Sequence, residues 1–216
     1  MTEHGTAAAI IDAPTTLSER LRTATMDRHH HAETRPFIAA LMGGELSLAD
    51  YVRYLAQFAW IYEALESRVR PDDPAFLREP RLARFPSIVA DLEALGAGDW
   101  RTSRPALPAT RAYVARLREV AVGGTPEYLA HHYTRYLGDL SGGQAIGAMI
   151  ARHYGATPDQ LGFFRFEGIE KPVAYKREYR AALDALELDE REREAAVAEA
   201  RRAFDFNAAV FDALAA

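Results

Sequence analysis

The chain of 216 residues contains no cysteine, which excludes several kinds of chemistry at the outset. Disulfides, cysteine nucleophiles and thiolate-ligated metal centres, such as zinc fingers and iron–sulfur clusters, all need this residue. The absence suits a reducing compartment, so we expect a cytoplasmic protein. Hydrophobic residues make up 49% of the chain and charged residues 26%, which is the balance of an ordinary soluble globular protein.

The chain also lacks an excess of positive charge and long apolar runs. Lysine and arginine number 26 against 31 acidic residues, and a net charge of −5 argues against a general nucleic-acid binder. No segment approaches the roughly 20 apolar residues of a membrane span, and the first residues lack the basic start of a signal peptide. We therefore expect no nucleic acid and no membrane as partners. We interpret residues 1–14 as a flexible arm and residues 15–216 as one domain.

Composition and patterning predict an all-α fold, because alanine is abundant, β-branched residues are few and no segment has the pattern of a strand. Capping boxes begin at Thr16 and Ser47, and Pro36 is expected to stop the first helix. Thr125 is expected to cap a long helix that ends before Gly155. The predicted helices cover about residues 16–34, 47–70, 87–95, 109–122, 125–154, 157–163, 170–187 and 190–213.

The most unusual stretch is YTRYLGDLSGGQ, residues 133–144, inside the long predicted helix. Each glycine inside a helix costs about 1 kcal/mol relative to alanine. Gly138 and Gly142 lie one turn apart and form a face without side chains, which admits either another helix or a large flat ligand. Gly143 does not extend this face, so we interpret it as a source of flexibility. Asp139 is either an exposed charge or a buried acid that organises water.

A second candidate site lies in RHHHAE, residues 28–33. Successive helical residues point about 100° apart, so the three histidines cannot all bind one metal ion. Solvated side chains or a fortuitous surface metal site are the alternatives. His29 has Arg22 two turns before it and Glu33 four residues after it, on nearly the same face. This set suits a heme-type ligand, with the imidazole on iron, the cation near a propionate and the carboxylate orienting the imidazole.

Two further segments combine polar and aromatic residues. In YKREYR, residues 175–180, Lys176 and Arg180 share a helix face beside two tyrosines, which suits a planar anionic ligand. The alternative is a solvated charged face. In AFDFN, residues 203–207, Asn207 is polar within an otherwise apolar run, and an exposed side chain is the alternative.

Together these segments resemble the heme oxygenase family, in the same order and over about residues 16–214. YTRYLGDLSGGQ is similar to the distal-helix motif of that family over its whole length, which makes the resemblance specific. The resemblance implies a multi-helix fold that holds heme between a proximal and a distal helix. It also implies that His29, three residues before Ala32-Glu33, is the axial iron ligand, with Glu33 as its acidic partner.

The resemblance implies roles for the other residues as well. Gly138 and Gly142 match glycines on the distal heme face, Gly143 matches a hinge-like kink, and Asp139 matches the carboxylate that holds a distal water network. Tyr62, Thr134, Arg135 and Asn207 match other members of that network, and Arg22, Tyr133, Lys176, Arg180 and Phe204 match residues around the heme. Met26 departs from the pattern, because the family often has a basic residue there to contact a propionate. Lys176 and Arg180 favour oxidation at the usual α position.

The function implied by the resemblance is oxidative cleavage of heme b to biliverdin, carbon monoxide and ferrous iron, and we expect iron acquisition as its purpose. Heme is then both substrate and cofactor, O₂ is consumed, and electrons come from an external reductase or ferredoxin as redox partner. The family suggests a monomer. The alternative is a non-enzymatic heme carrier or sensor, which has no use for Asp139 and its polar network. A di-iron protein would need paired Glu-x-x-His motifs, which the sequence lacks, and a purely structural module leaves the glycines with Asp139 unexplained.

Overall fold

The computed structural model describes residues 15–68 and 70–216, and within these ranges it contains helices and no strand, which confirms the predicted all-α fold class. The flexible arm predicted for residues 1–14 lies outside the described residues. None of the helices in the described ranges has the length and hydrophobicity of a membrane span. The α-helices are α1 (Leu17–Glu33), α2 (Pro36–Gly43), α3 (Leu48–Glu66), α4 (Phe85–Ala94), α5 (Trp100–Ser103), α6 (Pro108–Val122), α7 (Thr125–Tyr154), α8 (Pro172–Asp184) and α9 (Glu190–Ala215), with short 3₁₀ turns η1 (Ala75–Arg78), η2 (Pro80–Leu82), η3 (Pro158–Gln160) and η4 (Gly162–Phe164).

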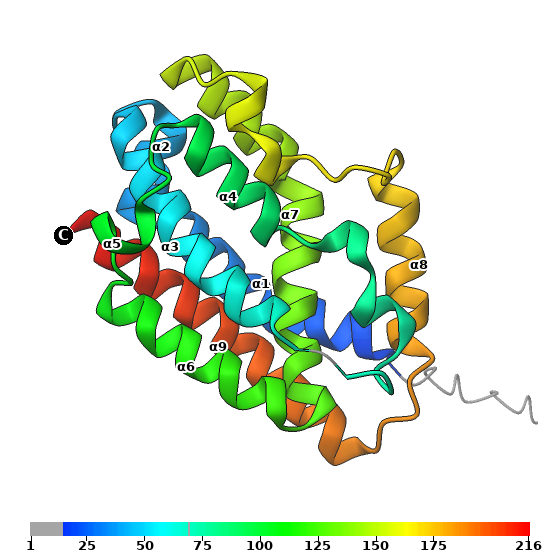
Figure 1. Cartoon of the computed structure of the whole chain (residues 1–216). Helices are drawn as coiled ribbons and strands as arrows, with labels where there is room; N and C mark the ends of the chain where they lie inside the picture. Colours follow the sequence, from blue (N-terminus) through cyan, green and yellow to red (C-terminus); the bar gives the residue numbers. More distant parts are fainter. Residues whose placement is uncertain (1–14, 69) are drawn as a thin grey trace, which may run out of the picture.

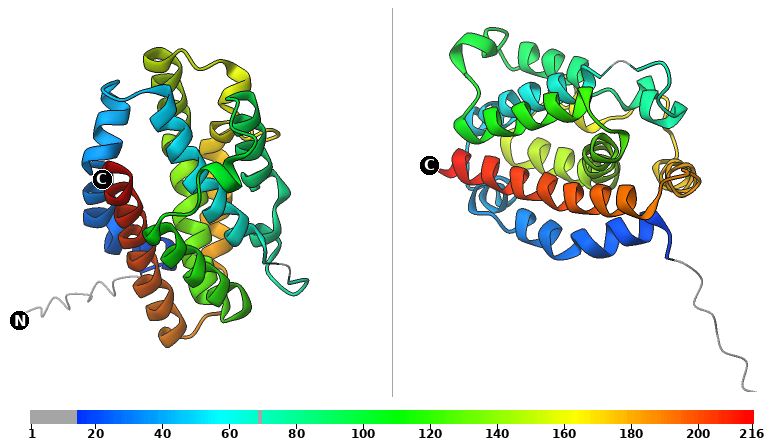
Figure 2. Two further views of the ribbon diagram at one scale, coloured as in Figure 1. Left: turned by 60° about the vertical axis from the view of Figure 1, so that its left-hand side comes forward. Right: turned by 90° about the horizontal axis from the view of Figure 1, so that it is seen from below.

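The helices pack around α3, in which twelve of nineteen residues are buried. The long helix α9 lies between α1 on one side and α6 and α7 on the other (Figure 2). The shorter α8 stands at the edge of the bundle, where it packs on α1 and α7 (Figure 1). This arrangement places α1 and α7 on two sides of a space whose floor is formed by α3 and α9.

Local capping sets several helix ends as predicted. The side chains of Thr16 and Ser47 each accept a hydrogen bond from the third helical residue, and both capping boxes are complete. Gly155 ends α7 in the left-handed conformation, with φ of 68°. The start of α7 differs by one position from the prediction, because Gly124 is the capping residue and Thr125 is the first helical residue.

Other helix boundaries differ from the prediction for identifiable reasons. Pro36 does not simply stop a helix, because it also begins α2, where its fixed φ and missing N–H suit the first turn. Helix α3 ends at Glu66 rather than near residue 70, and Arg68 turns inward to a buried ion pair with Asp73, with 2.6 Å between Nη2 and Oδ1. The helix predicted at 157–163 is instead the two 3₁₀ turns η3 and η4.

Two carboxylates, the partly buried Glu66 and the buried Asp91, hold the segments behind α7. Glu66 accepts hydrogen bonds from the backbone nitrogens of Arg84 (2.6 Å) and Phe85 (3.1 Å), and thereby caps α4, which has no side-chain cap of its own. Asp91 of α4 accepts from the backbone nitrogens of Gly162 and Phe163, each at 2.7 Å. These bonds fix η4 against the back of α7.

Candidate active site

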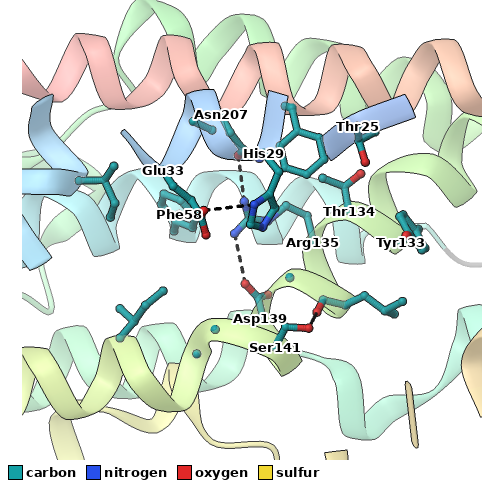
Figure 3. Close-up of a pocket in the computed structure, with 18 of the residues that line it drawn as sticks. Thr25, His29, Glu33, Phe58, Tyr133, Thr134, Arg135, Asp139, Ser141 and Asn207 are labelled. Atoms are coloured by element: carbon teal, nitrogen blue, oxygen red, sulfur yellow. Dashed lines mark hydrogen bonds and ion pairs between the residues drawn. The ribbon is translucent and has the colours of Figure 1, made fainter. Parts of the chain in front are cut away.

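A pocket of about 540 Å³ lies between α1 and α7, which is within the usual range for small-molecule sites. Helix α1 forms one wall, the middle of α7 forms the facing wall, and α8 contributes to the edge (Figure 3). Aromatic side chains from α3, α9 and η4 form its apolar part. These are Tyr54, Phe58, Phe163, Phe164, Phe204 and Phe211.

His29 is the histidine of the RHHHAE segment that lines the pocket, whereas His30 and His31 do not line it. Its Nδ1 lies 3.2 Å from Oε2 of Glu33, one turn later on α1. The ring also meets the edge of Phe204, with 5.6 Å between the ring centroids. Because Nδ1 faces a carboxylate, the proton of a neutral imidazole is held on Nδ1, and Nε2 keeps its lone pair for a ligand.

Helix α7, which forms the facing wall, has glycines on two of its faces. A Cβ placed on Gly138 would meet no atom within 4 Å, and one on Gly142 would meet only the tip of Ile146, so this side is open backbone facing the pocket. On the opposite side, Gly143 and Gly147 face Phe164. A Cβ on Gly147 would lie 3.1 Å from Cβ of Phe164, so this glycine is needed for close packing.

This arrangement adds a packing role to the interpretation of Gly143. Its side faces Phe164 at ordinary contact distance, and α7 is continuous through this position. Sequence reasoning missed Gly147, although the spacing Gly143-x-x-x-Gly147 is the signal for a second smooth face.

Asp139 belongs to a hydrogen-bonded polar network beside the pocket. Tyr62 donates its hydroxyl to Oδ2 of Asp139, and Nη2 of Arg135 lies 3.5 Å from Oδ1. Arg135 also donates to Tyr62 Oη (3.1 Å) and to Oδ1 of Asn207 (2.9 Å), as the dashed lines in Figure 3 show for Asp139 and Asn207. Burial raises the pKa of Asp139, while Arg135 and the Tyr62 hydrogen bond oppose the shift.

Arg135 is the centre of this network. Its guanidinium is buried and lies over the rings of Phe58 and Tyr62, at 4.7 and 5.1 Å from their centroids. Three polar partners from α3, α7 and α9 and two aromatic faces therefore fix its position. Tyr62 itself does not line the pocket and acts from behind Asp139.

Thr134, which the resemblance matched to the distal polar network, faces the pocket one residue before Arg135. Its side chain lines the pocket, but Oγ1 is buried and has no hydrogen-bond partner among the described residues. A buried polar atom without a partner costs about 1–3 kcal/mol. Thr134 therefore marks a point where a bound molecule or water in the pocket would be stabilised.

The mouth of the pocket is lined by cationic and polar side chains. Arg22 of α1, Tyr133 of α7 and Arg180 of α8 all line it. Burial raises the pKa of Tyr133, and the nearby cations Arg180 and Arg22 oppose this. Met26 lies between Arg22 and His29 on the same face of α1 and is 62% exposed.

Lys176 does not line the pocket with the other cations. Its Nζ donates to Oγ of Ser141 on α7 at 2.9 Å, and Ser141 itself lines the pocket. Ser141 was not singled out from the sequence, and neither were most of the aromatic side chains of the pocket. Nothing in their local pattern distinguishes them from ordinary core residues.

Fold and site together define a class of helical protein. Its pocket suits a flat anionic ligand, with an imidazole on one wall and an open backbone wall with a buried acid opposite.

Comparisons with known proteins give the family. The family model for heme oxygenase matches residues 15–213. Heme oxygenase 1 of Gallus gallus is 37% identical over 205 residues, covering 92% of this chain and 69% of that protein. Heme oxygenase 1 of the cyanobacterium Nostoc is 32% identical over 203 residues, covering 92% of this chain and 85% of that protein. The chain belongs to the heme oxygenase family, and it is an enzyme of that class, an oxidoreductase.

Solved structures agree with this assignment. Heme oxygenase-1 from the cyanobacterium Synechocystis, in complex with heme, has a TM-score of 0.86 at 31% identity, covering 92% of this chain and 91% of that one. Heme oxygenase from Leptospira interrogans also has a TM-score of 0.86, at 30% identity, covering 91% and 98%.

Proposed function

We propose that this pocket binds heme b between α1 and α7, with His29 as the axial ligand, and that the chain cleaves heme to biliverdin, carbon monoxide and ferrous iron. The observation that carries the proposal is the pairing of His29 on one wall with open glycine backbone and Asp139 on the other. An imidazole wall and a side-chain-free wall leave room for a flat ring between them.

The residues present fit such a ligand. Beside Gly138 there is open space that a side chain would fill, and Thr134 presents an unpaired hydroxyl. Arg22, Tyr133 and Arg180 at the mouth supply charge and hydrogen-bond donors for carboxylate groups. Lys176 joins this set if it leaves Ser141, to which it is bonded at 2.9 Å.

Heme, when bound, supplies the iron at which O₂ is activated and the ring carbon that is oxidised. His29 presents Nε2 to the pocket because Glu33 accepts the proton of Nδ1. A thiolate axial ligand promotes cleavage of the O–O bond. A neutral imidazole lacks this strong electron donation, so it suits a reaction in which the bound oxygen attacks the ring. The cysteine-free sequence is consistent with this choice of ligand.

The facing wall excludes side chains from the reacting ring. Gly138 and Gly142 present only backbone, so no side-chain acid from these positions touches the reacting atoms. Asp139 stands beside this wall, held by Tyr62 and Arg135, and its raised pKa suits a group that takes up and releases a proton. It passes protons to the pocket through water.

Electrons and O₂ come from outside the chain in this proposal. A separate reductase or ferredoxin supplies the electrons, and the protein works as a cytoplasmic monomer in one domain, with iron release from heme as its use to the cell. The cysteine-free composition supports a reducing compartment.

The test is reconstitution with heme followed by reduction under O₂ with ascorbate or a reductase. We expect the heme absorption band to disappear and a biliverdin band to replace it. A correctly ligated complex that forms no biliverdin would exclude the enzyme and leave the heme carrier or sensor, so turnover separates the two functions.

A further inference from the structure

His132 is a buried histidine that the proposed chemistry does not use. It lies on α7 directly before Tyr133, is 3% exposed, and has its Nδ1 2.8 Å from Oη of Tyr179 on α8. Tyr179 has no other hydrogen-bond partner among the described residues, and in the tautomer that carries its proton on Nε2 the imidazole accepts from the Tyr179 hydroxyl at Nδ1. The two rings are nearly parallel, 5.8 Å apart, and Tyr136 covers the imidazole edge-on at 4.5 Å.

This bond matters because α8 is attached by few contacts. Of its thirteen residues, only Tyr179 and Leu183 are buried, and the helix stands at the edge of the bundle (Figures 1 and 2). Its C-terminal end is tied to α1 through Asp184, which accepts from N and Oγ of Ser18 at 2.7 and 2.8 Å. Near its N-terminal end, the Lys176–Ser141 bond is exposed. The bond from His132 is thus the buried polar tether between α7 and α8.

The next residue on each helix lines the pocket mouth. Arg180 follows Tyr179, and Tyr133 follows His132. Because both tethered residues adjoin mouth residues, a shift of α8 along α7 would move Arg180 directly. We propose that His132 is a positioning residue, whose hydrogen bond to Tyr179 holds α8 in the register that keeps Arg180 at the mouth. The inference rests on the proposed function, since it assigns to Arg180 a carboxylate of bound heme.

The experiment measures the rate of heme release to an excess of a scavenging apomyoglobin. Tyr179→Phe removes the donor and keeps the ring, and we expect release about three- to tenfold faster, the range for one lost hydrogen bond or ion pair. The same change is then made in an Arg180→Ala background. If His132 acts through Arg180, Tyr179→Phe has little further effect there.

Two additional variants separate positioning from loss of stability. His132→Gln keeps an acceptor for the Tyr179 hydroxyl and is expected to release heme as slowly as the wild type. His132→Leu offers no acceptor and is expected to release heme faster. Tyr128→Phe is the matched control, because Tyr128 also makes a buried hydrogen bond from α7, to Leu65 O at 3.1 Å, and its ring, which lies near that of His132, is kept in the variant. It should lower thermal stability without changing heme release.

Three results would overturn the proposal. They are release from Tyr179→Phe at the wild-type rate, an equal effect with and without Arg180, or the same acceleration in Tyr128→Phe. Failure of the proposed function would look different, because the wild-type chain would then bind no heme through an imidazole or would form no biliverdin.

Discussion

At the scale of the single residue, Asp139 is an acid that lines the pocket and is held in place by its neighbours. Its side chain is 16% exposed, while Tyr62 and Arg135 bond both of its oxygens. The partners keep the carboxylate in place, and burial raises its pKa. A proton donor with fixed geometry and a shifted pKa is what general acid catalysis needs.

Asp139→Asn is therefore expected to bind heme but to lose biliverdin formation by about 10²-fold or more, the usual share of a general acid. The amide keeps the shape and can still meet Tyr62, but it cannot release a proton at neutral pH. Heme binding is measured by absorbance titration and turnover by the biliverdin band. Asp159→Asn, which changes an exposed carboxylate in η3, is the control. Full turnover by Asp139→Asn would contradict the role.

His29 gives a second prediction for a single residue. His29→Ala is expected to lose the imidazole-ligated heme spectrum, because the other two histidines of the segment do not line the pocket. Absorption and electron paramagnetic resonance spectra of the ferric complex report the ligand. His30→Ala should keep the wild-type spectrum. If His29→Ala also keeps it, His30 or His31 is the ligand instead.

Helix α7 illustrates a conflict between helix stability and ligand space. Gly138 lies inside a helix, where alanine is better by about 1 kcal/mol, and its Cβ would meet nothing. The heme-free protein therefore has room for a side chain at this position. Glycine there lowers the stability of the heme-free helix without a steric reason.

Gly138→Ala should accordingly raise the free energy of unfolding of the heme-free protein by about 0.5–1 kcal/mol. It should weaken heme binding at the same time, because the methyl group projects into the pocket. Urea unfolding and heme titration measure the two effects. Gly143→Ala faces Phe164 at ordinary contact distance and is the control, expected to change heme binding less. Unchanged heme affinity in Gly138→Ala would show that the ligand does not approach this wall.

The ends of the elements show what the sequence could predict. Capping at Thr16, Ser47 and Gly155 is local, so the residues alone were sufficient. The end of α3 depends on Asp73 receiving Arg68, a tertiary contact that no local pattern announces. The stretch at 133–144 predicted the open face correctly, because i and i+4 spacing is also local. The packing face of Gly143 and Gly147 requires Phe164, which comes from another segment.

At the scale of the whole molecule, two adjacent buried histidines join α7 to three other helices. His131 Nε2 lies 2.8 Å from Oε1 of Glu199 on α9, and its Nδ1 lies 3.4 Å from Oη of Tyr113 on α6. His132 binds α8. Burial lowers the pKa of both imidazoles, in His132 to about 3. Burial opposes ionisation of Glu199, but the hydrogen bond from His131 and those from Nε and Nη2 of Arg116, each at 2.8 Å, lower its pKa.

These groups predict loss of stability in acid. The unfolded chain protonates His132 below its ordinary pKa of 6.5, but the folded protein does so only near pH 3. The unfolded state thus binds more protons, and the free energy of unfolding falls as pH drops through this window, by up to about 1.4 kcal/mol per pH unit for one group. Glu199, whose pKa is lowered to about 2, adds a further loss below about pH 4.5.

His132→Leu should reduce the slope of the unfolding free energy against pH between 6 and 4 by up to about 1.4 kcal/mol per pH unit, which corresponds to one proton. The reason is that the substitution removes the imidazole that the folded state cannot protonate in this range. Urea unfolding of the heme-free protein at several pH values measures the slope. Tyr128→Phe loses a buried hydrogen bond from the same helix but no imidazole, and it should lower stability equally at every pH. An unchanged slope in His132→Leu would contradict burial of a neutral His132.

The assembly of the pocket was only partly foreseeable at this scale. Residues with unusual chemistry for their position, such as His29 and Asp139, were identifiable in the sequence. The aromatic side chains of the pocket, such as Phe58 and Phe211, come from α3 and α9 and resemble any core residue until the helices are placed. Lys176 was expected among the pocket residues, but its bond to Ser141 places it beside them.

The two glycine faces of α7 have a mechanical consequence. Helix α7 carries Gly138 and Gly142 toward the pocket and Gly143 and Gly147 against Phe164, so its backbone packs on η4 with no side chain between them at these positions. At these four glycine positions, helix α7 has no side chain to separate its backbone from the neighbouring layer. The segment 162–164, which Asp91 anchors, supplies Phe163 and Phe164 to the pocket lining, so the place of this segment helps to set the shape of the pocket. The carboxylate of Asp91, which is not among the lining residues, thereby fixes the position of two aromatic rings that are.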